Sequence, residues 1–382
     1  MLMLRLLLLT CLISLSVSVP ASAQTRRVPA EFEPQESIWM QWPKGIERSY
    51  RPDFTAIIGT LEPYETIHVI VDDASARTQA QNYLSNRGVS LANIDWHLIP
   101  YDWAWLRDNG PVWVEVDGVL TAQDWVFDGW GGEVPDVTYW DQDDAVPCQI
   151  AAVEGEPCEA YAVVNERGTL EFNGVDTLIT SWPVLHDRNP GWTQVQLEAL
   201  FAQAFGVTRV VWLLSSPASD VITGGHVDGI ARFIDADRVV VNRFANPGHP
   251  DASVYEEAAQ IIADAGFEVL RLEIPGAVNY KGVSMDANYI NWLVVNGAVV
   301  TTGFGNASWD AAAAAEIAAF FPDRDVHVVP TLELWYWGGG VHCVTNDLPI
   351  PVPEPAAGLL LAAGASCLAA LSRLRARRSP FG

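Results

Sequence analysis

The chain has 382 residues, of which 49% are hydrophobic and 16 are tryptophan, so it can bury a large core. Its formal net charge is −25, from 47 Asp and Glu against 22 Lys and Arg. That charge repels phosphate, which argues against a nucleic-acid partner, and it attracts cationic small molecules.

The first 23 residues have the features of a secretory signal peptide. Arg5 precedes an apolar run over residues 6–19, and Ala21-Ser22-Ala23 offers a cleavage site of small residues. The run is shorter than the ~20 apolar residues that a membrane span needs. We therefore expect cleavage after Ala23, export, and a single mature domain over residues 24–350. Solubility outside the cell would then account for part of the acidity.

Four strand pairs joined by tight turns are predicted along the mature chain. They lie at residues 112–116 and beyond, 169–180, 230–241 and 289–302, with turns near positions 117, 173, 236 and 296. Three of the turns contain Asp-Gly or Asn-Gly, a strong hairpin signal. Helices are predicted between them, over residues 75–87, 192–205, 251–265 and 307–321. Turns about 60 residues apart favour repeated hairpin-plus-helix modules arranged as a propeller. The alternative is an α/β sheet whose regularity arises by chance.

Polar residues stand just before these strand pairs. Asp108 lies within Trp105–Pro111, His226 and Asp228 lie within 224–229, and Cys343 follows the glycines at 338–340. In a ring of modules they would converge on one axis. Two carboxylates can clamp a guanidinium, a thiolate can attack its carbon, and a histidine can protonate departing ammonia and then activate water. The spacing of His226 and Asp228 predicts that both side chains share one face of a strand.

The cysteines separate into three groups. Cys11 and Cys367 lie in apolar terminal segments, and Cys148 and Cys158 are close enough to pair, so we predict a disulfide in an oxidising compartment. Cys343 is left as a candidate nucleophile. The alternatives are an inert buried cysteine, a zinc site made with His and Asp, and a surface binding protein without chemistry.

Several motifs together resemble the agmatine deiminase and bacterial peptidyl-arginine deiminase family. They are Trp105–Pro111, 225–229, Tyr289-Ile290-Asn291 and 338–345, with further matches at Trp42-Pro43 and 187–190, in order over about 30–347. The resemblance implies the pentein fold, a pseudo-symmetric five-module α/β propeller. It also implies hydrolysis of a guanidinium through a covalent cysteine thiouronium intermediate, with no metal and no cofactor.

Roles for individual residues follow from the matched motifs. The resemblance implies that Cys343 is the nucleophile, that His226 is the general acid and base, and that Asp108 and Asp228 clamp the guanidinium. We expect further substrate contacts from Asn291, Trp105 and Glu166.

One position departs from the family pattern. Arg167 stands where the family motif Glu-Gly-Gly has a glycine. We expect its side chain to point to solvent and to pair with Glu166 or Glu171. The alternative is that it points inward and changes what enters the site. A glycine there could also have positive φ, which would strain an arginine.

The substrate tail is predicted from charge. Between Arg107 and Arg167 there are fourteen Asp and Glu and no Lys or Arg, and residues 128–159 within this stretch could form a lid. A carboxylate tail would need a cationic partner. We therefore expect agmatine to be converted to N-carbamoylputrescine and ammonia. Because the protein is expected outside the cell, the alternative is deimination of arginine side chains in proteins.

The C-terminal residues 351–382 resemble a PEP-CTERM sorting signal. Val352-Pro353-Glu354-Pro355 precedes an apolar segment over 356–371 and a cluster of arginines. The resemblance implies a sorting and processing machinery, transient anchoring by residues 356–371, and a final location at the cell surface or outside. An ordinary C-terminal membrane anchor is the alternative.

Overall fold

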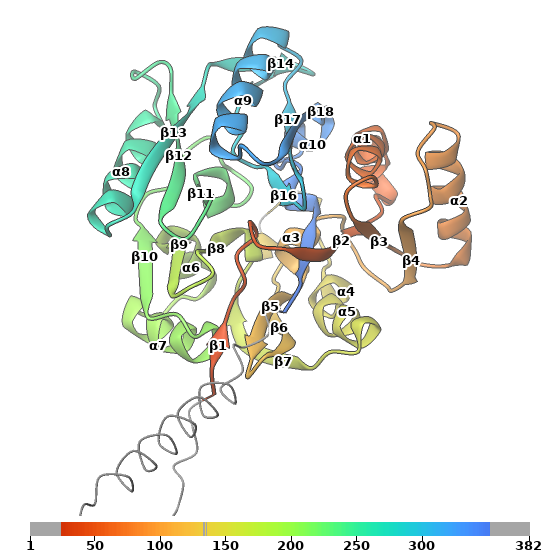
Figure 1. Ribbon diagram of the computed structural model, residues 1–382, viewed down its shortest axis with the longest axis horizontal. Coiled ribbons are helices and arrows are strands. Elements are labelled where there is room, and N and C mark those ends of the chain that lie inside the picture. Colours follow the sequence, from red (N-terminus) through yellow and green to blue (C-terminus); the bar gives the residue numbers. More distant parts are fainter. Residues whose placement is uncertain (1–23, 133, 135, 352–382) are drawn as a thin grey trace, which may run out of the picture.

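The computed structural model describes residues 24–132, 134 and 136–351 (Figure 1). The predicted signal peptide and sorting segment, and with them Cys11 and Cys367, lie outside these described residues. Among the described residues, no helix is both long and apolar enough to cross a bilayer.

Five sheets repeat one plan, in which an antiparallel strand pair is followed by one or more helices and by a strand parallel to the second strand of the pair. The first in the chain comprises β5 (Val112–Val116), β6 (Val119–Val126), α4 (Asp141–Asp144), α5 (Val146–Glu154) and β7 (Cys158–Val164). The next comprises β8 (Leu170–Phe172), β9 (Thr177–Ser181), α6 (Trp182–Arg188), α7 (Gln194–Phe205) and β10 (Arg209–Leu213).

The following two sheets keep the same plan. One comprises β11 (Ala231–Phe233), β12 (Arg238–Phe244), α8 (Ala252–Asp264) and β13 (Glu268–Ile274). The other comprises β16 (Leu293–Val295), β17 (Ala298–Gly303), α9 (Ala307–Phe320) and β18 (Asp325–Pro330). A separate hairpin, β14 (Ala277–Tyr280) with β15 (Val283–Asp286), lies between them in the chain.

The fifth sheet takes strands from both ends of the chain. β19 (Asn346–Pro349) pairs antiparallel with β2 (Gln35–Gln41), so that Asn346 lies opposite Trp39. The sheet continues through α1 (Arg51–Leu61), β3 (Thr66–Val71), α2 (Ala74–Ser85) and β4 (Ile94–Leu98). The short β1 (Arg26–Arg27) joins β5 in the first sheet. The start and end of the domain are therefore fastened to each other.

The predicted modules are confirmed. All four helices agree with the predicted ranges to within two residues. At the first predicted turn, Asp117 and Gly118 have φ of 51° and 80°, the left-handed pair that a two-residue hairpin loop requires. The third strand of each sheet was not predicted, because a parallel strand is joined through a long crossover and leaves no turn signal beside its partner.

The buried core lies between each sheet and its helices. In the sheet of β11, β12 and β13, buried Val239 and Val241 of β12 pack with Ile262 of α8. In the first sheet, Cys148 of α5 and Cys158 of β7 form the predicted disulfide, with their Cα atoms 5.5 Å apart. Helix and strand are thereby linked at the edge of that sheet.

Candidate active site

Short turns before the first strands of the sheets carry most of the site residues. The turns are α3 (Leu106–Asn109) before β5, η3 (Arg167–Thr169) before β8, η4 (Val227–Gly229) before β11, and η5 (His342–Val344) before β19. Asn291 stands two residues before β16. Because the sheets repeat one plan, equivalent positions in each sheet bring these residues to one place.

His226 and Asp228 were predicted to share one face of a strand, and this prediction is wrong. Asp228 lies within the 3-10 turn η4, His226 directly precedes it, and the strand begins only at Ala231. Gly225, with φ of 106°, lets the chain turn sharply before His226. Both side chains still line the same cavity.

The Cys343 thiol lies at the junction of two cavities. It is 7% exposed, and its Sγ lies 3.4 Å from Asn291 Oδ1 and 3.8 Å from Asp228 Oδ2. Burial, followed by the charges of Asp228 and Asp108, raises the pKa of the thiol well above its ordinary value. Without a cation beside it, Cys343 is therefore a thiol and not a thiolate.

His226 is held between two carboxylates. Its Nε2 lies 2.7 Å from Glu166 Oε2, and its Nδ1 lies 3.5 Å from Asp108 Oδ1. Burial lowers the pKa of His226, but these two carboxylates outweigh burial and raise it to about 9. At neutral pH the imidazole is therefore cationic and able to donate a proton.

Glu166 was expected among the substrate contacts, and the structure places it behind His226. It is completely buried, and its other oxygen accepts a hydrogen bond from Arg188 Nε at 2.7 Å. Glu166 does not line either cavity. Its contacts fix the orientation and the charge of the imidazole.

Each carboxylate oxygen of Asp108 is held by one hydrogen bond. Its Oδ2 accepts from Trp130 Nε1 at 2.9 Å and its Oδ1 accepts from the Gly168 amide at 3.1 Å. A Cβ on Gly168 would lie 2.4 Å from His226 Nδ1, so only glycine fits there. Burial, opposed by His226, raises the pKa of Asp108 to about 6. The carboxylate is still mostly ionised at neutral pH.

Asp228 is the second carboxylate at the thiol. Burial raises its pKa, but hydrogen bonding and charge from His342 outweigh burial and leave the pKa below its ordinary value. Its Oδ2 lies 2.7 Å from His342 Nδ1. Asp108 and Asp228 thus present two anions to the space beside Cys343.

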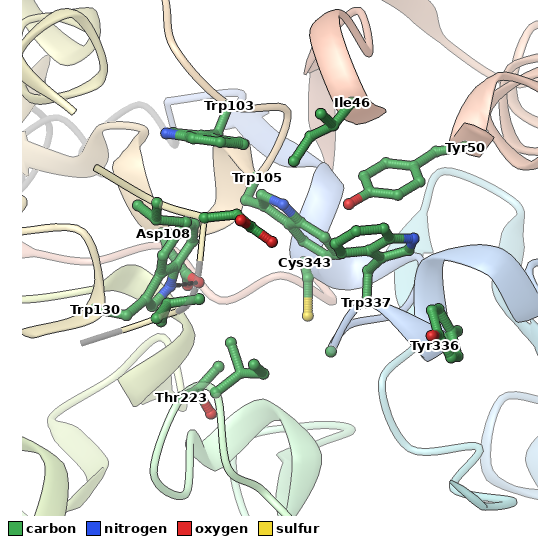
Figure 2. A pocket seen from close by; sticks show the side chains of 15 residues that line it. Ile46, Tyr50, Trp103, Trp105, Asp108, Trp130, Thr223, Tyr336, Trp337 and Cys343 are labelled. Atoms are coloured by element: carbon green, nitrogen blue, oxygen red, sulfur yellow. Dashed lines mark hydrogen bonds between the residues drawn. The ribbon is translucent and has the colours of Figure 1, made fainter. Parts of the chain in front are cut away.

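The two cavities meet at Cys343 and differ in character. The first, of about 180 Å³, is lined by aromatic rings, and Figure 2 shows the sulfur pointing into the space that they surround; they are Tyr50, Trp103, Trp105, Trp130, Tyr336 and Trp337. The second, of about 290 Å³, is more polar and contains Asp228, Asp286 and Asn291. Among the described residues that line the cavities, none is Lys or Arg.

Arg167 was expected to reach solvent and to pair with Glu166 or Glu171, and both expectations are wrong. It is 9% exposed, and its Nη2 lies 2.8 Å from Asp347 Oδ1. Asp347 of β19 also binds Arg107 at 2.9 Å. Because a buried guanidinium needs an anion, Arg167 pairs with the buried Asp347 and does not reach solvent. Its φ is not positive, so the backbone is not strained there.

The expected lid over residues 128–159 is only partly at the site. Trp130, Val134, Asp136 and Val137 line the first cavity. From α4 onward the segment packs against its own sheet, and buried Asp143 accepts hydrogen bonds from the amides of Asp102 and Trp103. The second half of this stretch is therefore part of the framework.

Metal-binding geometry lies elsewhere in the described part of the chain. Two clusters bring three possible ligand atoms close together: Asp124 with Cys148 and Cys158, and His249 with Asp251 and Asp286. In the first cluster both sulfurs form the disulfide. Neither cluster includes Cys343 or His226.

Sequence reasoning missed the charged groups behind the site. Glu31 contacts Arg232, Arg107 and His342, and Arg232 also contacts Glu171. His342 lies inside a motif that was singled out for its cysteine, so its place in the motif was the available signal. Glu31 lies outside the quoted motifs, and nothing in its local sequence indicates that it is buried.

Comparison with known proteins identifies the family. A family model described as Porphyromonas-type peptidyl-arginine deiminase matches residues 27–349. The chain belongs to this family. An agmatine deiminase of Pseudomonas putida is 30% identical over 364 residues, which cover 85% of this chain and 96% of that protein.

Solved structures agree with this membership. The agmatine deiminase of Enterococcus faecalis superposes with a TM-score of 0.77 at 28% identity, covering 86% of this chain and 96% of the other. The C. jejuni agmatine deiminase, with a TM-score of 0.78 at 18% identity, supports the fold alone. The chain therefore has the α/β pentein fold of these deiminases.

Proposed function

We propose that the protein is a hydrolytic deiminase of guanidinium compounds and that agmatine is its substrate. One observation carries the proposal: a thiol, a cationic imidazole and two carboxylates, from Cys343, His226, Asp108 and Asp228, converge beside cavities whose described lining includes no cation. A planar cation between two carboxylates is the ligand that best fits this charge pattern.

The first half of the reaction forms a bond to sulfur. A guanidinium between Asp108 and Asp228 offsets the negative charge that keeps Cys343 protonated, so the thiol releases its proton to solvent when substrate binds. The thiolate attacks the guanidinium carbon. The His226 imidazolium then protonates one amino group, ammonia leaves, and a cationic thiouronium remains on Cys343.

The second half returns the enzyme to its starting state. The neutral His226 takes a proton from a water molecule, which attacks the thiouronium carbon. The carbon–sulfur bond breaks, the hydroxyl proton passes to sulfur, and a ureido compound leaves. For agmatine the products are N-carbamoylputrescine and ammonia.

The lining of the cavities favours an amine tail. An arginine carboxylate would stand in a partly dry space among Asp side chains without a cation, which costs a few kcal/mol. An ammonium group can instead lie over aromatic rings such as Trp105 and Trp337. We infer that Trp105 and Asn291 contact the substrate, and that Glu166 acts only through His226.

Arginine side chains in proteins are the second candidate. Apolar residues are exposed around the cavities, including Val221 at 81%, Ile46 at 54% and Val283 at 45%. An internal arginine carries no free carboxylate, and its neighbours in a peptide could cover such residues. This favours protein arginine over free arginine as the alternative to agmatine.

We also infer that the five sheets close into the five-module propeller and that the domain over residues 24–350 is exported. The shared plan of the sheets and the pairing of β19 with β2 support closure. The disulfide between Cys148 and Cys158 supports an oxidising location. Mass analysis of protein recovered from the producing cells would test cleavage after Ala23 and processing near Pro353.

Ammonia release from agmatine, free arginine and an internal arginyl peptide, assayed side by side, tests the proposal. We expect agmatine to have the highest kcat/KM, and Cys343→Ser to release no ammonia from it. Preference for the peptide would move the function to protein arginine. No release from any of the three by a folded wild-type protein would refute deimination.

A further inference from the structure

The ring of His342, the residue before the nucleophile, lies between two carboxylates. Its Nδ1 is 2.7 Å from Asp228 Oδ2 and its Nε2 is 2.7 Å from Glu31 Oε2. His342 is 3% exposed, so water does not substitute for either partner. A neutral imidazole has one N–H, and an ionised carboxylate only accepts. Both contacts are therefore hydrogen bonds only while the three groups together hold two protons.

The charges around Glu31 indicate where those protons lie. Arg232 Nη2 is 2.7 Å from Glu31 Oε1, and Arg107 Nη2 is 3.3 Å from Oε2. Burial opposes ionisation of Glu31, but Arg232, His342 and Arg107 hold its pKa well below the ordinary value. Glu31 is thus a carboxylate, as is Asp228, and both protons belong to the imidazole.

The imidazolium depends on its two carboxylates. Burial, followed by the charges of Arg107 and Arg232, leaves the pKa of His342 below its ordinary value, against the opposing effect of Glu31 and Asp228. The second proton is therefore held by geometry, because each of the two 2.7 Å contacts with a carboxylate needs an N–H on the ring. Removal of the Glu31 charge would therefore release the second proton. The ring would remain in place as a neutral imidazole that donates only to Asp228.

Asp228 connects this ring to the nucleophile. The Oδ2 atom that faces His342 also lies 3.8 Å from Cys343 Sγ. We propose that His342 is a positioning residue, which as an imidazolium supported by Glu31 fixes Asp228 and offsets its charge at the Cys343 sulfur. The inference rests on the proposed role of Cys343 as nucleophile. Without that cation, Asp228 acts on sulfur with its full negative charge and the thiolate is harder to form.

The substitution Glu31→Gln removes the negative charge of this side chain and nearly keeps its shape. The glutamine amide can donate to Nε2 of a neutral His342, so both contacts survive while the cation is lost. We expect the pH midpoint for alkylation of Cys343 by iodoacetamide, followed on its peptide by mass spectrometry, to rise by about one unit. With agmatine, kcat at neutral pH should fall about tenfold and recover between neutral pH and the pH near 9 at which His226 loses its proton, and KM should not rise.

Glu171→Gln is the matched control, because Glu171 contacts the other side of Arg232, at 3.0 Å, and not His342. It should not raise the alkylation midpoint. An unchanged midpoint in Glu31→Gln, or an equal rise in both variants, would overturn the proposal. Alkylation needs no turnover, so an inactive wild type would refute the deiminase function and leave this test intact.

A wild-type measurement keeps the proposal testable if Glu31→Gln does not fold. In protein labelled with ¹⁵N-histidine, NMR at neutral pH should show two slowly exchanging N–H groups on the His342 ring. A His342 ring with a single N–H would contradict the proposal.

Discussion

At the scale of single residues, the site holds opposite charges in a fixed pattern before substrate arrives. His226 is a cation because Asp108 and Glu166 face it, and Cys343 is a neutral thiol because Asp228 and Asp108 repel a thiolate. A bound guanidinium changes this balance in favour of the thiolate. The enzyme would thus become nucleophilic only where its substrate is present, which protects the thiol from other electrophiles.

The pKa values of Asp108 and His226 predict how each kinetic constant depends on pH. Asp108, with its pKa near 6, must be ionised to attract the guanidinium, so KM for agmatine should rise as pH falls below about 6. His226 must be protonated to release ammonia, so kcat should fall as pH rises toward 9, since a bound cation only lowers its pKa further. Steady-state kinetics between about pH 5 and pH 10 test both limbs. A KM that stays flat below pH 6 would remove Asp108 from substrate binding.

The nucleophile itself gives the largest predicted effect. Cys343→Ser should lose on the order of 10³-fold or more in kcat, because a hydroxyl in this acidic surrounding does not ionise. His226→Asn should also remove activity. Circular dichroism and thermal unfolding should match wild type for the serine variant, whose shape is nearly conserved. Near wild-type turnover by Cys343→Ser would rule out the covalent route.

At the scale of elements, a turn that precedes the first strand of a sheet is where function concentrates. The same place carries Asp108 before β5, Asp228 before β11 and Cys343 before β19. The turn before β8 carries Arg167 instead, and there the charge serves the framework. Equivalent turns therefore carry catalytic residues in three sheets and a buried ion-pair residue in the sheet of β8.

The buried pair of Arg167 and Asp347 predicts a loss of stability without a change of substrate. Arg167→Gly should lower the free energy of unfolding by about 3 kcal/mol, because the buried Asp347 then keeps only Arg107. The ratio of kcat/KM for agmatine to that for arginine should stay within about twofold, since Arg167 lines neither cavity. Arg87→Gly, at an exposed arginine, is the control for both measurements. A changed ratio in Arg167→Gly alone would place the guanidinium in contact with substrate.

The disulfide predicts a second effect on stability that leaves the kinetics unchanged. Reduction of Cys148–Cys158, which encloses a short loop, should lower the free energy of unfolding by about 2–3 kcal/mol. Neither cysteine lines the cavities, so kcat/KM for agmatine should not change. In a Cys148→Ser, Cys158→Ser double variant the reductant should have no effect. Equal stability of the reduced and oxidised proteins would show that packing alone holds α5 against β7.

Local sequence patterns correctly predicted the turns and helices, because these depend on residues that are neighbours in the chain. The turn at Asp117-Gly118 and the helix over Ala307–Phe320 follow from residues within a few positions. Glu31 and His342 are separated by 311 residues, and so their contact has no local pattern. Arg167 was misplaced for the same reason, because Asp347 lies 180 residues further along the chain. The motif resemblance identified the site residues. Their protonation states follow only from the burial and the charged neighbours that the fold gives them.

At the scale of the whole molecule, the net charge of −25 acts on every ligand that approaches. The potential around the protein attracts cations before any specific contact forms, and salt screens it beyond about 8 Å at physiological ionic strength. Near the cavities, Asp136, Asp220 and Asp286 add to this field. The acidity thus favours entry of agmatine, which carries two positive charges, over arginine, which also carries a carboxylate.

Salt should therefore weaken the reaction with agmatine more than the reaction with arginine. Agmatine carries two positive charges and arginine one net charge, so kcat/KM for agmatine should fall more steeply between low and high ionic strength. The two substrates share the guanidinium, so arginine serves as the internal control. Equal slopes would mean that the acidic surface acts on solubility and not on substrate capture.

The pairing of β19 with β2 also sets when activity can appear during folding. The nucleophile stands three residues before a strand whose partner was made more than three hundred residues earlier, and Glu31 comes from that early segment. Contacts of such long sequence separation form late in folding. A partly folded chain would have its helices and most of its sheets before it had any reactive centre. The domain would acquire its chemistry in a single final step, when the last strand, β19, pairs with β2.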